Sequence, residues 1–417
     1  MDAVYLDHAS TSVPKAPGVA EAVARALTAE LGGAGRGAHA AADAARRVVE
    51  RCRADLARAT GTAAHGVVLT GGATDAIHTA LFGLLGEGGG LSGDRPRRVV
   101  MSWMEHHAVT RAAARLERLG RARVEVLGLD EAGRLDPVEV AEACARGEGA
   151  SVCVVSAASN VTGQAQAIGA IARELRARSP GTLLVCDASQ AAGVTDPRDP
   201  EDGYAHADLV AFGAHKGWRS AAGIGALLVG TRAFDPAGDP EVQALQPVRF
   251  GGTGGEGEGD PSPAPAAMPG RFEAGTAPVA LAAGWSAGIA AHEPGAVERQ
   301  RAWLAEVIAR TSALPGLVWF GAAGRVQREG DAAWLVGTVP VASFAVEGDG
   351  WTPDVLAAAL DASFQIRVRA GLHCASLAHR ALGTAGRGGL VRVSPGPGAG
   401  EREADRFVGA LGALLGG

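Results

Sequence analysis

The sequence predicts an α/β protein with a mostly parallel sheet and a second, smaller lobe. Short apolar runs alternate with helical patterns through the first two thirds of the chain, and strands separated by helices are typical of a parallel sheet covered on both faces. The length of 417 residues exceeds that of one ordinary domain, so two lobes are the default expectation. Hydrophobic residues make up 47% and charged residues 20% of the chain, which indicates a globular protein rather than a disordered one.

The elements of the first lobe are expected in the order strand, loop and helix. A helix from about Ala40 to Ala59 precedes the strand GVVLT, the turn GGAT and another helix from Asp75. The order returns in RRVVMSW with a helix from about Ala108 and in ASVCVVSAA with a helix from about Gly169. A further strand is expected in TLLVCDAS.

A glycine- and proline-rich stretch, Gly251 to Gly270, excludes a regular element at that point. Beyond it we expect a helical segment through about Arg310, a mixture that includes VGTVPVASFAV, and a final helix from Glu401. These patterns predict a large domain at residues 17–290. Residues 1–16 and 291–417 are expected to form the small domain.

Charge and hydropathy exclude several classes of partner. The net charge of -6 argues against a nucleic-acid-binding surface, which needs a basic stripe. The N-terminus MDAVYLDHAS carries no basic region followed by an apolar run, so no secretory signal is expected. No apolar segment approaches the roughly 18 to 20 residues of a membrane span. A cytoplasmic enzyme is the simplest expectation.

The five cysteines are an odd set without CxxC spacing, which disfavours both a disulfide framework and a zinc site, and no metal is expected. Cys153 and Cys186 lie within apolar runs and are predicted to be core residues. Cys374 differs, because RAGLHCAS places it near Arg369, His373 and His379. Cationic neighbours lower the pKa of a thiol and make it a usable nucleophile.

Lys216 and Asp187 form the strongest pair of candidate site residues. Lys216 lies in AFGAHKGWRSAAGIGALLVG; a lysine among glycines, taken alone, is more often a solvated loop residue. Asp187 ends the strand in LLVCDASQAAG, where it points toward a cleft or, as the simpler alternative, caps the next helix. An enzyme that uses pyridoxal phosphate (PLP) needs a lysine for the cofactor aldehyde and a carboxylate for its pyridine nitrogen. The pair therefore predicts a PLP site.

Two further motifs fit a PLP site. TGGATDAIHTAL places glycines before a helix, whose free N–H groups attract phosphate, and Thr74 adds a hydroxyl donor. SWMEHHAV follows another strand, and His106 or His107 can stack on a planar ring or act as an acid or base. Isolated histidines are more often surface or capping residues.

The motifs together resemble a known family. In chain order LDHASTS, GATDAI, MEHHAV, SNVTG, DASQAAG, GAHKG, RFEAGT and VRAGLHCA are similar to the class V aminotransferases of fold type I, specifically the branch of cysteine desulfurases and selenocysteine lyases. The resemblance runs from Tyr5 to the last helix. It implies a PLP-binding large domain with a mostly parallel seven-stranded sheet, a smaller α+β C-terminal domain, and a homodimer.

The resemblance also implies roles for individual residues. Lys216 would hold PLP as a Schiff base, Asp187 would pair with the pyridinium nitrogen, and His106 would stack on the ring. The remaining cofactor contacts would come from Ala73, Thr74, Asn160, Gln190, His215 and, in the neighbouring subunit's site, Thr276. Arg369 and Arg392 resemble the arginines that bind the substrate carboxylate, with Asn160 close to the substrate. Cys374 corresponds to the sulfur-accepting cysteine, on a short ordered segment.

Three positions depart from the family pattern. Gly213 stands where a serine is common, His8 replaces asparagine in the opening motif, and SPGPGAG replaces the usual polar tail after the substrate arginine. The implied activity is removal of sulfur from L-cysteine, or from a related thiol or selenol amino acid, giving alanine and a persulfide on Cys374. The sulfur of this persulfide would then pass to a sulfur-acceptor protein. One alternative keeps the cofactor but changes the reaction, to that of an aminotransferase, a racemase or epimerase, or a C–S β-lyase. The other alternative is a scaffold that has kept the fold without activity.

Overall fold

The computed structural model describes residues 3–35, 37–131, 133–252, 265–293, 295–321, 326–329, 332–335, 337–348 and 350–416. The helices are α1 (Val19–Thr28), α2 (Ala40–Thr60), α3 (Ala73–Leu85), α4 (His107–Arg118), α5 (Pro137–Ala145), α6 (Ile168–Arg178), α7 (Val279–Ala290), α8 (Ala296–Thr311), α9 (Pro353–Phe364), α10 (Ser376–Ala381) and α11 (Glu401–Leu415). The strands are β1 (Val4–Tyr5), β2 (Val67–Thr70), β3 (Arg97–Ser102), β4 (Ala122–Leu127), β5 (Val152–Ser156), β6 (Leu183–Asp187), β7 (Leu209–Gly213), β8 (Gly225–Val229), β9 (Leu317–Phe320), β10 (Val326–Glu329), β11 (Ala332–Leu335), β12 (Ala342–Val346), β13 (Ile366–Arg367), β14 (Arg369–Gly371) and β15 (Leu390–Val393).

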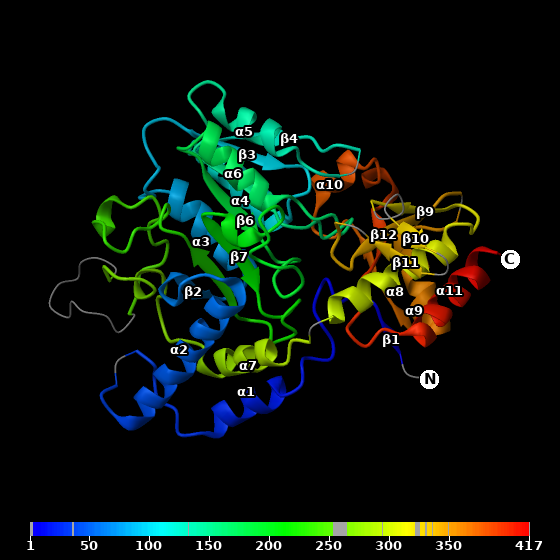
Figure 1. The fold of residues 1–417 in the computed structure, drawn as a ribbon, viewed down its shortest axis with the longest axis horizontal. Coiled ribbons are helices and arrows are strands. Elements are labelled where there is room, and N and C mark those ends of the chain that lie inside the picture. The colour runs from blue at the N-terminus through cyan, green and yellow to red at the C-terminus, as the bar shows by residue number, and fades with distance from the viewer. Residues whose placement is uncertain are drawn as a thin grey trace.

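The central sheet of the large domain has seven strands in the order β2-β8-β7-β6-β5-β3-β4. Strand β8 runs antiparallel to both of its neighbours, and all other adjacent pairs are parallel. Helices of the same domain surround the sheet in Figure 1. The α/β fold class with a mostly parallel sheet is therefore confirmed.

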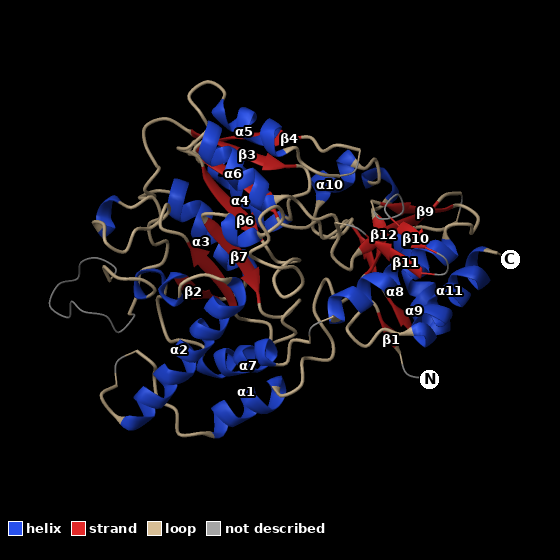
Figure 2. Cartoon of the chain, viewed as in Figure 1, coloured by secondary structure: helices blue, strands red, loops and turns tan. Residues whose placement is uncertain are grey.

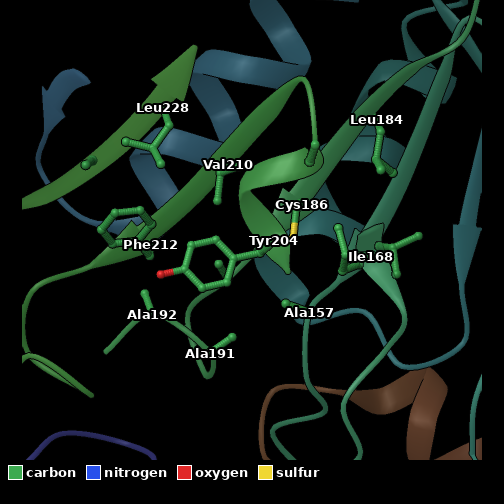
Figure 3. Packing of buried hydrophobic residues seen from close by; sticks show 14 of the residues in the cluster. Ala157, Ile168, Leu184, Cys186, Ala191, Ala192, Tyr204, Val210, Phe212 and Leu228 are labelled. Atoms are coloured by element: carbon green, nitrogen blue, oxygen red, sulfur yellow. The ribbon is translucent and has the colours of Figure 1, made fainter. Parts of the chain in front are cut away.

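The two faces of this sheet carry separate cores because successive side chains of a strand point to opposite sides. Cys153 and Val155 of β5 pack in the core that also receives α2, α5, α6 and α7. Val152 and Val154 of the same strand pack in the core under α3 and α4. Within the first core, Figure 3 shows the Tyr204 ring close to the strands, near Phe212 and Cys186. Cys153 and Cys186 are both buried, as the apolar runs predicted.

The small domain is built on a four-stranded antiparallel sheet, β14-β15-β12-β9. Helices α8, α9 and α11 lie beside it (Figures 1 and 2). Strand β1 pairs in parallel with β13, and Val4 and Leu6 share a core with Phe344 and Phe407. The N-terminal residues thus lie with the C-terminal elements, while the division at residues 290 and 291 stays a prediction.

The start of one helix and the glycine- and proline-rich stretch can be compared with what the sequence predicts. Helix α3 begins at Ala73 rather than near Asp75, so the glycine turn leads directly into it. Most of the glycine- and proline-rich stretch, residues 253–264, lies outside the described residues. Among the helices that are described, none combines the length and the apolar character that crossing a membrane requires.

Candidate active site

A cavity of about 670 Å³ lies at the carboxyl ends of the central strands, next to the small domain. Strands β5, β6 and β7 end at this edge in Ser156, Asp187 and Gly213, which all line the cavity. The predicted site residues that also line it are Ala73, Thr74, His106, Asn160, Gln190, His215, Lys216, Arg369, Cys374 and Arg392. Residues far apart in the sequence therefore meet in one place.

Lys216 and Asp187 both line the cavity. Burial lowers the pKa of the Lys216 amine, and the nearby Asp187 carboxylate only partly opposes this effect. The Lys216 amine makes no hydrogen bond to any of the described residues. Asp187 is 6% exposed, and its Oδ1 accepts a hydrogen bond from the Ser189 N–H at 2.9 Å. The other carboxylate oxygen is thus left for a partner in the cavity.

The N-terminus of α3 forms one wall of the cavity. Gly72, with φ of 145°, is the N-cap and has no side chain to satisfy the first turn. Within the described part of the chain, the N–H groups of Ala73 and Thr74 have no hydrogen-bond partner, as expected for a helix end that faces a ligand. A Cβ on Gly213 would lie 3.7 Å from the Ala73 nitrogen. The same Cβ would lie 3.2 Å from Cδ2 of His215, so a serine at position 213 would crowd the His215 ring.

Three further polar side chains line the cavity, those of His215, His106 and Gln190. Nδ1 of His215 is buried without a partner, and burial lowers the pKa of His215 to about 4. Nδ1 of His106 accepts from the Ala108 N–H at 3.0 Å and caps α4, and burial also lowers the pKa of His106. The Gln190 amide donates to the Ala9 carbonyl at 3.0 Å. His106 therefore combines the capping role with a position on the cavity.

Glu105 is a residue of this region that the sequence reasoning did not single out. It is fully buried and accepts hydrogen bonds from the hydroxyls of Ser102 and Ser156, each at 2.6 Å, and from the Ser156 N–H at 3.0 Å. Burial raises the pKa of Glu105 to about 7 despite these three donors. Its place beside His106 in MEHHAV was the available signal, but only the fold shows that the carboxyl links β3 to β5.

The two candidate substrate arginines lie opposite each other on neighbouring strands, since Arg369 of β14 pairs with Arg392 of β15. They differ in their contacts. Arg392 is 3% exposed; it donates to Asp7 Oδ1 and Ser10 Oγ, both at 2.7 Å, and to the Asn160 carbonyl at 3.0 Å. Arg369 is exposed, and its guanidinium pairs with no described residue. Of the two arginines, Arg369 is therefore the one whose guanidinium is available to a ligand.

Cys374 is the exposed cysteine among the five, which are all unpaired. It lies on the segment between β14 and α10, where His373 and Cys374 have φ of 49° and 56°. L-residues rarely adopt this left-handed conformation, which is typical of functional sites. The thiol is thus carried by a strained, ordered turn at the cavity.

The expectation that His373 and His379 act as cationic neighbours of Cys374 is wrong. Burial lowers the pKa of His373 to about 2, with the charge of Arg392 as a further cause. Burial likewise lowers the pKa of His379 to about 4. Both rings are neutral near pH 7, so the positive charge near Cys374 comes from the arginines.

Thr276 does not line this cavity. It lines a neighbouring cavity of about 790 Å³, which shares Gly71, Asp75 and Gly223 with the first. The buried Arg53 donates to both carboxylate oxygens of Glu273 at 2.7 and 2.6 Å on the same side. Thr276 therefore lines the cavity next to that of Lys216 and not the Lys216 cavity itself.

Comparisons with known proteins identify the family and similar proteins. A family model described as aminotransferase class-V matches residues 4–407. The protein named cysteine desulfurase IscS from Anaeromyxobacter sp. (strain Fw109-5) is 34% identical over 227 residues, which are 54% of this chain and 52% of that protein. This alignment thus spans about half of the relative's length. A probable cysteine desulfurase from Methanothermobacter thermautotrophicus is 29% identical over 401 residues, covering 94% of this chain and 90% of the relative.

A solved structure is similar over the whole chain. The apo structure of a cysteine desulfurase from Thermococcus onnurineus NA1 has a TM-score of 0.84 and 27% identity, and the match covers 99% of this chain and 95% of that one. Both lobes therefore have counterparts in one known structure.

Proposed function

The chain belongs to the aminotransferase class-V family, and on this basis we propose that it is a PLP-dependent cysteine desulfurase. The proposed reaction takes sulfur from L-cysteine, or from a related thiol or selenol amino acid, to give alanine and a persulfide on Cys374. One observation carries the proposal: the exposed Cys374 borders the same cavity as Lys216 and Asp187. The relatives' names support the same activity.

The residues of the cavity fit PLP. The free N–H groups of Ala73 and Thr74 suit a phosphate, and the partnerless Nδ1 of the neutral His215 supplies a further polar contact. The unpaired amine of Lys216 suits the cofactor aldehyde, and the open oxygen of Asp187 suits a protonated pyridine nitrogen. His106 would lie against the ring, with Gln190 and Asn160 at its edge.

When bound, PLP supplies a conjugated electron acceptor that stabilises negative charge at the substrate Cα. The Lys216 Nζ would act as the base for the Cα proton, and burial supports this role because it lowers the pKa of the amine. Arg369 binds the substrate carboxylate, since Arg392 already donates to Asp7 and Ser10. Arg392 then fixes Asn160 through the bond to its carbonyl.

Sulfur transfer balances without a further reactant. The Cys374 thiolate attacks the substrate sulfur, an S–S bond forms and the Cβ–S bond breaks, and the bonding pair stays with Cβ. Protons restore the methyl group of alanine. The net change converts L-cysteine and the Cys374 thiol into alanine and the Cys374 persulfide.

The persulfide needs a second thiol to release its sulfur. The exposure of Cys374 supports transfer to a sulfur-acceptor protein. We also propose that the active unit is a homodimer in which Thr276 reaches the neighbouring subunit's PLP phosphate.

The Cys374→Ala variant tests whether sulfur leaves the substrate through a persulfide on Cys374. The variant should form alanine from L-cysteine roughly 100-fold more slowly, because the nucleophile for sulfur is lost, while it keeps PLP and the absorbance change on adding L-cysteine. Alanine, sulfide and protein-bound persulfide are measured with and without reductant. Cys52→Ala, which removes a buried thiol on α2 outside the cavity, should remain active.

Release of sulfide at the wild-type rate by Cys374→Ala would exclude the persulfide route. That result would favour the alternative of a C–S β-lyase of the same family. Formation of a keto acid and no alanine would instead indicate an aminotransferase.

A further inference from the structure

The turn that carries Cys374 is held in place by side-chain and backbone groups of the large domain. Asn160 Nδ2 donates to the His373 carbonyl at 2.6 Å. The backbone N–H of His107 donates to the Cys374 carbonyl at 2.7 Å. Within the turn, the Ala375 N–H donates to the Leu372 carbonyl at 2.8 Å. The carbonyl groups of both left-handed residues, His373 and Cys374, therefore accept hydrogen bonds from the large domain.

His107 contacts this turn a second time through its ring. Nε2 of His107 lies 3.1 Å from Oγ of Ser376 and accepts from the Ser376 N–H at 3.3 Å. The backbone N–H of His107 thus bonds the Cys374 carbonyl and its ring nitrogen contacts Ser376, so that His107 holds the chain on either side of Ala375. Such paired bonds restrict the rotation that would release the strained turn.

The two adjacent histidines of MEHHAV, His106 and His107, have different surroundings. His106 lines the cavity, whereas His107, the first residue of α4, is half-buried and is not among the residues that line it. His107 faces α10 instead, through Ser376. It therefore acts on the reaction only through the segment it holds.

We propose that His107 is a positioning residue that holds Cys374 at the cavity in its left-handed conformation. The inference rests on the proposed function in so far as Cys374 accepts the sulfur. A nucleophile displaced by about 1 Å can lose roughly 100-fold in rate even when the chemistry is intact. His107 keeps the Sγ of Cys374 at the distance that attack on the substrate sulfur requires.

The test compares His107→Leu with His107→Gln. Leucine removes the ring nitrogen and keeps the backbone N–H, while glutamine restores a polar atom near the position of Nε2. In single-turnover experiments on the PLP-loaded enzyme, His107→Leu should form the Cys374 persulfide about 10- to 100-fold more slowly. The absorbance change on adding L-cysteine should keep its rate, and His107→Gln should recover most of the persulfide rate.

Hydrogen exchange gives a readout that does not depend on activity. Peptides covering residues 370–378 should exchange roughly 10-fold faster in His107→Leu, because the turn opens locally. Arg115→Leu, an exposed change on α4, is the matched control and should behave as wild type. Should His107→Leu fail to fold, Ser376→Ala removes the partner hydroxyl and should produce the same two effects in smaller degree.

Unchanged exchange and an unchanged persulfide rate in His107→Leu or in Ser376→Ala would overturn the inference. Failure of the proposed function looks different. It appears as release of sulfide at the wild-type rate by Cys374→Ala, whatever the histidine variants do, and the exchange measurement still decides whether His107 holds the turn.

Discussion

At the scale of single residues, environment separates groups that look alike in the sequence. Lys216 was predicted from its pairing with Asp187, yet its lowered pKa arises from burial in the fold. Arg369 and Arg392 are equivalent in the family pattern, but Arg392 donates to Asp7, Ser10 and the Asn160 carbonyl. Each difference is created by residues distant in the chain.

The fold also changes the pKa of Glu105. Its carboxyl is fully buried beside Ser102 and Ser156, and Ser156 pairs in register with Asp187. Since the folded pKa of Glu105 is raised to about 7 from 4.5, the folded protein holds this proton more tightly than the unfolded chain. The carboxyl therefore destabilises the fold progressively as pH rises from the unfolded to the folded pKa.

Replacing Glu105 by glutamine should remove this pH dependence. The difference in free energy of unfolding between Glu105→Gln and wild type should shift in favour of the variant by on the order of 3 kcal/mol as pH rises from about 4.5 to 7. Denaturant titrations of the PLP-loaded proteins across this range measure it. Glu21→Gln, an exposed change on α1, should give a flat difference, and a flat difference for Glu105→Gln would contradict the raised pKa.

At the scale of elements, the ends of strands and the N-terminus of α3 place the site residues around the cavity. Helix α3 follows Gly72 directly, and this turn packs against the first residue of β8. A Cβ on Gly225 would lie 2.6 Å from the Gly72 Cα and 2.8 Å from the Phe212 carbonyl oxygen. The antiparallel strand therefore sets the position of the helix N-terminus.

Gly225→Ala should displace the α3 turn. We expect a loss of about 1 to 3 kcal/mol in stability, typical of overpacking, and a weaker affinity for PLP by roughly 10-fold because the N–H groups of the cradle move. Reconstitution of the PLP-free protein, followed by absorbance, measures the affinity. Gly128→Ala, where an added Cβ meets no atom within 4 Å, is the control; wild-type affinity in Gly225→Ala would exclude this role for β8.

At the scale of the whole molecule, Thr276 is separated from the other predicted site residues. It lines the neighbouring cavity, beside the α3 turn but outside the cavity of Lys216. This position supports a homodimer in which each site takes Thr276 from the other subunit.

Subunit mixing tests the shared site. When Lys216→Ala and Thr276→Ala chains are co-expressed in equal amounts, hybrid dimers contain one site with both original residues. At limiting PLP, activity should return to about a quarter of the wild-type value, since half of the dimers are hybrids with one intact site of two. Lys216→Ala alone should lack the visible band of lysine-bound PLP. Activity equal to the mean of the two separate variants would contradict a shared site.

The sequence by itself determined the fold class and most of the candidate site. Apolar strands alternating with helical patterns are local signals, and they predicted β2, β3, β5 and β6 and the helices that follow most of them. The ordered motifs predicted Lys216, Asp187, His106 and Cys374 as site residues through their resemblance to the class V aminotransferases.

Only the tertiary structure decided how these residues act. The neutral His373, the occupied Arg392, the buried Glu105 and the bonds from His107 to the Cys374 turn depend on contacts between distant segments. Burial and long-range hydrogen bonds set pKa values and orientation, and no local pattern encodes them. The thiol was therefore predictable from the sequence, whereas the support that holds it became visible only in the fold.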